Sequence, residues 1–264
     1  MIEIIIAAIL IFAVSLFFSM FGRGGGELYL PIMITLLGIS FYTAAGVSLF
    51  LIFLQGLSMV FIYSQKHKLT DWPVALVTAF IVGISSFLGG FLSKGIPGIY
   101  LKMLFIGFLI VAAFLLFLNK NVNIEAKGFG VWHRRFGGGE YNLNIFYLTI
   151  GVVIAGFLAG MIGISGCGLI IPIAILICGM PLRIAMGTNT FIVFASSSMG
   201  FLGHLVKGGI NWELALIFGA AIVVGSQIGS RLHAKLSEKF LRIGFAVILI
   251  FAASIMALKA LHIM

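Results

Sequence analysis

Residues 22–31 read GRGGGELYLP, and residues 163–172 read GISGCGLIIP. In both stretches a glycine cluster separates a long apolar segment from a short one that contains a proline. Glycine clusters allow unwound backbone and the close approach of a ligand. A short helix that follows such a cluster presents backbone N–H groups and the positive end of its dipole. The two stretches therefore predict a pair of helix breaks suited to an anion.

The two glycine stretches belong to a longer internal repeat. Matching positions in the first part of each half are Gly22 and Gly163, Gly25 and Gly166, Pro31 and Pro172, Gly38 and Gly179, and Lys66 and Lys207. After the loss of one residue, Trp72 matches Trp212 and Gly89 matches Gly229. Apolar matches arise by chance in an apolar chain, but matched glycine, proline, tryptophan and lysine with one gap do not. We infer an internal duplication.

The composition places the chain in a membrane. Of its 264 residues, 62% are hydrophobic and 9% are charged, whereas soluble domains carry about 25% charged residues. The net charge of +9 is therefore interpreted as loop charge that sets membrane orientation rather than as a nucleic-acid footprint. The two cysteines show no metal-ligand spacing, and no P-loop is present, so we expect no metal, cofactor or nucleic-acid partner.

Breaks at polar and Gly/Pro clusters divide the chain into apolar segments, and a helix needs about 20 apolar residues to cross the hydrocarbon core. Long segments are predicted at 4–21, 42–63, 72–92, 99–118, 145–162, 184–206, 212–231 and 240–261, and short ones at 27–37 and 168–178. The predicted fold class is an all-α polytopic membrane protein with two inverted repeats. Each repeat has about four long transmembrane helices plus one short broken or re-entrant helix. For the short segments, an interfacial or tilted helix is the alternative.

The domain organisation follows from the repeat: an N-terminal repeat at 1–120, a linker at 121–143 and a C-terminal repeat at 144–264. The run Gly137, Gly138 and Gly139 in the linker has no duplicate and predicts a flexible connection. If each short segment is counted as a further pass, each half makes five passes through the membrane. Because five is odd, the second half is then inverted relative to the first.

Charge bias supports the inverted arrangement. Leaving out Arg23 and Arg183, ten Lys and Arg residues then fall on the linker side and four on the other. The ten are Lys66, Lys68, Lys120, Lys127, Arg134, Arg135, Arg231, Lys235, Lys239 and Arg242, and the four are Lys94, Lys102, Lys207 and Lys259. The positive-inside rule predicts a cytoplasmic linker and both termini outside, in a prokaryotic plasma membrane.

The residues of the two breaks are the candidate substrate-binding residues. They are Arg23, Gly24, Gly25 and Gly26 in the first break and Ser165, Gly166, Cys167 and Gly168 in the second. Brought together by an inverted repeat, the two helix ends make an anion site near the bilayer midplane. The alternative is that the glycines only permit tight packing of helices.

Arg23 is the most informative residue, because a charge at membrane depth is costly and usually functional. Its planar guanidinium suits sulfonate, sulfite, carboxylate or phosphate oxygens. The alternatives are an ion pair with Glu27 and a side chain that extends to the membrane interface. Glu27 could hold Arg23 until substrate arrives, and it is also a candidate for carrying a coupling proton.

Polar residues at the start of the long helix after each short one are further candidates. Ser48 in the first half, and Thr188, Asn189 and Thr190 in the second, could donate to anion oxygens, or they could cap and link helices. His204 is a candidate proton relay or an interface anchor. Gly156 and Gly160 form a GxxxG spacing, which predicts close helix contact within the chain or across a homodimer.

These motifs give the chain a specific resemblance. The paired glycine stretches, residues 44–48 with their partners 185–190, and the Gly89 and Gly229 regions resemble the sulfite exporter TauE/SafE family, also called the toluene-sulfonate uptake permease family. The resemblance spans residues 4–261 and implies secondary transport of sulfur-containing or other small organic anions. Arg23, Ser165 and Cys167 depart from the family's pattern, which bears on the substrate more than on the fold.

We therefore predict a secondary active transporter of small anions, not an enzyme, that works by alternating access around the two breaks. Its partners are a small anionic substrate and the lipid bilayer. Two alternatives are kept. One is a cation or metal transporter, although Glu27 is almost alone among acidic residues in the spans. The other is an intramembrane serine protease, because GISG at 163–166 matches a rhomboid motif and His204 lies on the next long helix.

Overall fold

The computed structural model describes residues 2–117, 130–176 and 178–235, with a few isolated positions beyond. The helices of the first half are α1 (Ile2–Ser19), α2 (Gly26–Leu37), α3 (Phe41–Phe61), the π-helical turn η1 (Ile62–Lys66), α4 (Trp72–Leu92), the turn η2 (Ser93–Gly95) and α5 (Gly98–Phe117). Those of the second half are α6 (Ile145–Ile162), α7 (Cys167–Leu176), α8 (Leu182–Val206), α9 (Trp212–Leu232) and the turn η3 (His233–Lys235). Most of the predicted segment 240–261 and residues 121–129 of the linker lie outside the described residues.

The chain is an integral membrane protein built mostly of helices. In the part that the structure describes, six helices are long and apolar enough to cross a membrane, namely α1, α3 with η1, α4 with η2, α6, α8 and α9. On the outer faces of these helices, large apolar side chains such as Phe80, Leu216 and Ile9 are more than half exposed. Such a surface is stable against lipid rather than water.

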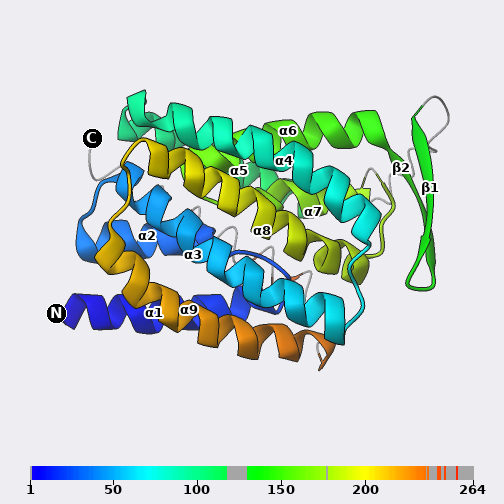
Figure 1. Ribbon diagram of the computed structural model, residues 1–264, viewed down its shortest axis with the longest axis horizontal. Coiled ribbons are helices and arrows are strands. Elements are labelled where there is room, and N and C mark those ends of the chain that lie inside the picture. The colour runs from blue at the N-terminus through cyan, green and yellow to red at the C-terminus, as the bar shows by residue number, and fades with distance from the viewer. Residues whose placement is uncertain are drawn as a thin grey trace.

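The helices run side by side along the long axis of the molecule (Figure 1). Helices α3 and α8 pack together at the centre, α4 lies on α8 and α6, and α1 lies on α9. The two predicted short segments are the separate short helices α2 and α7. Helix α1 begins at the end of the bundle opposite the two-stranded β-hairpin (Figure 1).

Matched glycines end the helices around both breaks. Gly163 caps α6 with a φ of 82°, and its repeat partner Gly22, just beyond α1, has a φ of 64°. Gly38 after α2 and Gly179 after α7 both have a φ of 63°. A positive φ of this size suits glycine because no Cβ opposes it. At each of these places the glycine allows the chain to turn out of the helix.

The halves also contact each other through equivalent groups. Ser48 Oγ donates to the carbonyl oxygen of Gly163 over 2.8 Å, and Asn189 Nδ2 donates to the carbonyl oxygen of Gly22 over 3.0 Å. Ser48 and Asn189 are repeat partners, as are Gly22 and Gly163. Each half therefore holds the break of the other half by the same kind of hydrogen bond.

The GxxxG spacing on α6 is used inside the chain. A Cβ at Gly160 would overlap the backbone carbonyl of Ser86 on α4, and one at Gly156 would lie 2.7 Å from Val82 Cγ2. The repeat partners Gly89 and Gly229 make the same kind of contact. A Cβ at Gly89 on α4 would overlap the carbonyl of Phe157 on α6, and one at Gly229 on α9 would overlap the carbonyl of Leu16 on α1. Because α4 covers the face of α6 that carries Gly156 and Gly160, this face is not available to a second copy of the chain. The homodimer stays a prediction.

The linker is where the sequence-based expectation was wrong. Instead of a flexible connection, residues 131–144 form an antiparallel hairpin of β1 (Val131–Phe136) and β2 (Gly139–Asn144). Gly137 and Gly138 make the turn with φ values of 59° and 79°, as hairpin turns with two positive φ values require. The fold is therefore not purely α-helical.

Candidate functional site

The two glycine breaks lie against each other, as the sequence predicts. A Cβ at Gly24 would lie 3.2 Å from Ser165 Cβ, and one at Gly26 would lie 3.1 Å from the carbonyl oxygen of Gly163. Only residues without side chains allow two backbones to come this close. Residues 22–27 and 163–166 are all buried. Cys167 begins α7 and Gly166 has a φ of 65°.

Arg23 lies between the breaks and is fully buried. Its Nη2 is 2.6 Å from Glu27 Oε1, and the same nitrogen is 3.4 Å from where a Cβ would stand on Gly168 of the second break. The guanidinium therefore extends from one break to the other. The predicted ion pair with Glu27 is present, and the alternative in which Arg23 reaches the membrane interface is wrong, because none of its side chain is exposed.

Glu27 stands in the first turn of α2 and is also fully buried. One carboxylate oxygen, Oε1, pairs with Arg23, while Oε2 has no hydrogen-bond partner among the described residues. A buried carboxylate is stable only with a compensating cation or a proton. In the described conformation Arg23 supplies this cation.

Gln55 on α3 organises the first break. Its Oε1 accepts from the Gly25 N–H over 3.1 Å and from the Tyr29 hydroxyl over 2.9 Å. Its Nε2 donates to Ser19 Oγ over 2.9 Å and to the Arg23 carbonyl over 3.1 Å. The side chain is fully buried. Gln55 thereby fixes the unwound backbone on both sides of Gly24.

The other polar candidates are close to the breaks but bond to protein groups. Thr190 Oγ1 donates to the carbonyl oxygen of Gly187 over 2.7 Å, and Thr188 Oγ1 accepts from the Asp71 N–H over 3.0 Å. Ser48 and Asn189 bond to Gly163 and Gly22, as described above. These residues hold the breaks in place, and direct contact between them and an anion stays a prediction.

His204 is buried in the helix bundle, so the interpretation as an interface anchor is wrong. Its Nε2 lies 3.1 Å from the carbonyl oxygen of Gly160, and its ring packs at a tilt against Tyr42 with centroids 4.9 Å apart. Its repeat partner, Tyr63, makes the equivalent bond to the carbonyl oxygen of Ser19 over 2.9 Å. His204 therefore links α8 to α6, and the proton-relay role remains untested.

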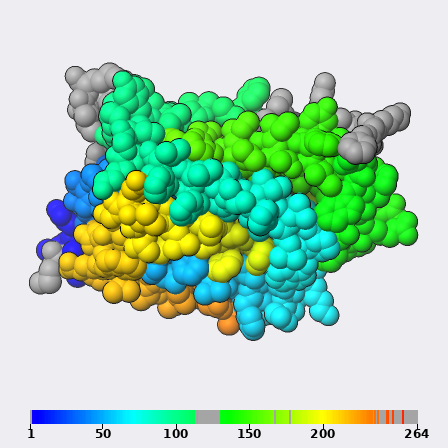
Figure 2. Space-filling view, turned by 45° about the horizontal axis from the view of Figure 1, so that its top comes forward, coloured from blue at the N-terminus to red at the C-terminus, as the bar shows by residue number. Residues whose placement is uncertain are grey.

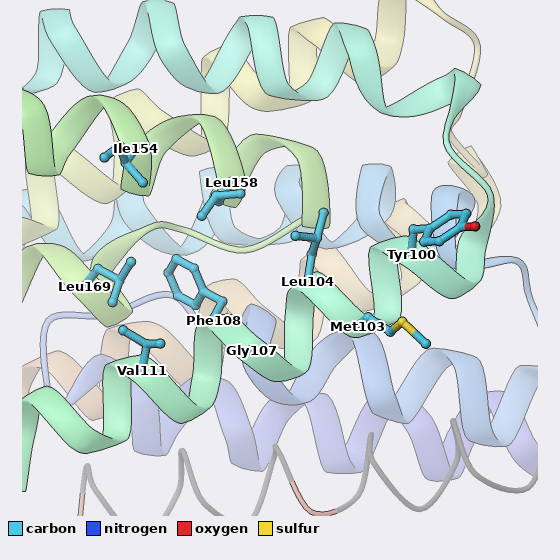
Figure 3. A pocket seen from close by; sticks show the side chains of 9 residues that line it. All are labelled: Tyr100, Met103, Leu104, Gly107, Phe108, Val111, Ile154, Leu158 and Leu169. Carbon is cyan, nitrogen blue, oxygen red and sulfur yellow. The ribbon is translucent and has the colours of Figure 1, made fainter.

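One cavity among the described helices lies outside the contact between the two breaks. It measures about 640 Å³ and lies between α5, α6 and α7 (Figure 3). The residues lining it are Tyr100, Met103, Leu104, Gly107, Phe108, Val111, Ile154, Leu158 and Leu169. The lining is almost entirely carbon and includes none of the predicted site residues. It suits apolar chains rather than an anion.

Asp71 marks a second feature that the sequence analysis missed. Its carboxylate is fully buried and accepts from Arg134 and Tyr141 of the hairpin. Burial, together with the hydrogen bond to Asp71, raises the pKa of the Tyr141 phenol well above its usual range, so Tyr141 remains a donor at physiological pH. For the hairpin, the available signal was the alternation of Tyr141 and Leu143 with polar residues after the glycine run.

The chain is similar in sequence to known membrane proteins. A model of the sulfite exporter TauE/SafE family matches residues 7–256. The probable membrane transporter protein YunE of Bacillus subtilis is 28% identical over 245 residues, covering 88% of this chain and 89% of the relative. The probable membrane transporter protein MJ0441 of Methanocaldococcus jannaschii is 30% identical over 255 residues, covering 90% and 89%. Sulfite exporter TauE/SafE family protein 6 of Arabidopsis thaliana is 33% identical over 97 residues, covering 37% of this chain and 22% of the relative. No solved structure matches the chain.

Proposed function

Because the chain belongs to the sulfite exporter TauE/SafE family, we propose that it is a secondary transporter of small anions. Sulfur-containing oxyanions or organosulfonates are the proposed substrate class. One observation carries the proposal: the fully buried Arg23 at the contact between the two glycine breaks. A buried guanidinium is the group best suited to bind the oxygens of a sulfite or sulfonate in two places at once.

Glu27 has a defined part in this proposal. In the described conformation Glu27 Oε1 lies 2.6 Å from Arg23 Nη2. It binds the guanidinium in the way that an oxygen of a substrate oxyanion would. Substrate binding then exchanges one anion for another, and Arg23 is never left without a partner. A displaced and still buried carboxylate is costly, so we expect Glu27 to take up a proton at that step and couple transport to the proton gradient.

Alternating access follows from two halves that move around the shared site. The reciprocal bonds of Ser48 and Asn189 support a two-fold relation between the halves. The opposite directions of α1 and α6 in Figure 1 support its inversion. The orientation with a cytoplasmic hairpin and external termini rests on the charge bias of the loops.

The alternatives have weaker support. Among the described residues, no group of three or more His, Cys, Asp or Glu could hold a metal ion. For a serine protease, His204 would have to serve Ser165 as a base, but His204 Nε2 lies against the Gly160 carbonyl. A fluorophosphonate probe that labels Ser165 would favour the protease.

A thermal-shift panel on purified protein tests the substrate class. We expect sulfite and organosulfonates to raise the melting temperature and monovalent and divalent cations to leave it unchanged. At about 100 times the dissociation constant, binding to the folded state adds about 2.7 kcal/mol of stability. The same panel on the Arg23→Gln/Glu27→Gln variant should show no shift. A shift with cations and none with oxyanions would contradict the proposal.

A further inference from the structure

Asp71 stands directly before α4, at a position where aspartate normally caps the helix, yet its side chain makes no capping bond. Its repeat partner Asn211 stands directly before α9 and does cap it, accepting from the Leu214 N–H over 3.2 Å. Losing such a cap costs about 0.5–2 kcal/mol. The Asp71 carboxylate instead accepts hydrogen bonds from the hairpin.

The contact with the hairpin joins both of its strands to Asp71. Arg134 Nη2 is 2.7 Å from Asp71 Oδ1 and Arg134 Nε is 3.2 Å from Oδ2, while the Tyr141 hydroxyl donates to Oδ2 over 2.5 Å. Arg134 and Tyr141 are directly paired across the two strands. The ring of Trp132 lies 4.9 Å from the guanidinium carbon. We call Asp71, Arg134 and Tyr141 the latch.

From the latch, a chain of contacts reaches the first glycine break. The backbone N–H of Asp71 donates to Thr188 Oγ1 over 3.0 Å, and Thr70 Oγ1 donates to the carbonyl oxygen of Gly187 over 3.2 Å. The next residue, Asn189, donates to the carbonyl oxygen of Gly22. Figure 2 shows the green hairpin end of the molecule lying against the cyan start of α4. The hairpin is thus tied to the same α8 residues that hold the break.

A small cavity lies beneath the hairpin. Its lining includes Leu143 of β2, Thr78 of α4, and Thr188 and Asn189 of α8. Thr78 Oγ1 and Asn189 Oδ1 are both buried there without a hydrogen-bond partner among the described residues. The cavity measures about 10 Å³, close to the space that the centre of one water needs. Two of the residues that line this cavity therefore carry buried oxygens without a partner, as expected of a place that water enters at some stage.

We propose that this cavity is the closed end of the substrate path on the hairpin side, that Thr78 and Asn189 line the path, and that the hairpin is its gate, held shut by the latch. The inference rests on the transport function proposed above. Opening separates Arg134 and Tyr141 from Asp71 and lifts Leu143 away. Water and substrate then reach Asn189 and, behind it, the break at Gly22.

Cysteine accessibility tests the gate without needing a known substrate. In a background with Cys167 and Cys178 replaced by alanine, Thr78→Cys is the reporter and Ser86→Cys, fully buried on the same helix, is the control for general loosening. The latch is broken by Asp71→Asn/Arg134→Gln. The matched control is Arg135→Gln/Glu140→Gln, an ion pair on the same two strands whose side chains are 83% and 69% exposed.

We expect a water-soluble thiol reagent to modify the Thr78→Cys reporter at least ten-fold faster when the latch is broken than in the intact or matched-control protein. The thiol of the Ser86→Cys control should stay protected throughout. An unchanged rate at the reporter, or equal acceleration at the control position, would overturn the gate. The labelling result does not depend on which solute is carried. If the proposed anion specificity were wrong, the labelling result would therefore still hold. Oxyanion flux together with an unchanged labelling rate at Thr78→Cys would contradict only the gate.

Discussion

Replacing Arg23 and Glu27 together by glutamine is expected to lower oxyanion flux in proteoliposomes by about 100-fold or more, while the protein still folds. A guanidinium that binds a substrate oxyanion by two charge-assisted hydrogen bonds contributes about 1.5–3 kcal/mol from each, and each 1.4 kcal/mol is a factor of about ten in binding. The double variant removes both buried charges, so neither is left unpaired in the bundle.

The single variant Arg23→Ala separates folding from transport less cleanly. It would leave Glu27 fully buried without its cation, and breaking a buried pair in this way costs about 3–5 kcal/mol. The exposed pair Arg135 and Glu140 gives a charge-matched control, whose double glutamine variant should transport normally. Flux that survives in Arg23→Gln/Glu27→Gln, with the melting temperature unchanged, would remove Arg23 from the site.

Gly160→Ala is expected to lower the free energy of unfolding by about 2–3 kcal/mol, because overpacking a closely packed interior typically costs about 1–3 kcal/mol. The added methyl would overlap the backbone carbonyl of Ser86, which cannot move without shifting α4. Chemical denaturation in detergent, followed by tryptophan fluorescence, measures the loss.

Gly107→Ala on α5 supplies the control for this change. A Cβ at Gly107 meets nothing within 4 Å, and alanine is the better helix former. We expect this variant to be as stable as the parent or slightly more so. Equal losses for Gly160→Ala and Gly107→Ala would show that α4 and α6 are not packed as described.

Much of the helical framework could be predicted from the sequence. Helix α4 has the predicted bounds, Trp72–Leu92, because tryptophan and the polar residues before it mark the membrane edge. The short helices α2 and α7 were predicted from glycines that the structure holds at positive φ. The family predicted from these motifs is confirmed by the match over residues 7–256.

The hairpin was missed because Gly137, Gly138 and Gly139 were interpreted by composition alone. The alternation of buried Tyr141 and Leu143 with exposed residues would have indicated a strand. Gln55 could not have been placed by spacing, because its five hydrogen bonds join groups on α1, α2 and the break itself. Nor could the sequence show that Asn189 commits its amide donor to the Gly22 carbonyl, since that contact depends on the packing of two halves far apart in the chain.

The most direct measurement is an anomalous difference map from crystals of the protein grown with selenite, a heavier relative of sulfite. We expect one selenium peak at the contact between Gly24–Gly26 and Gly166–Gly168, with oxygens about 3 Å from the Arg23 guanidinium and the Glu27 carboxylate turned away. A well-occupied peak at another place in the bundle, with Arg23 still bound to Glu27, would contradict it.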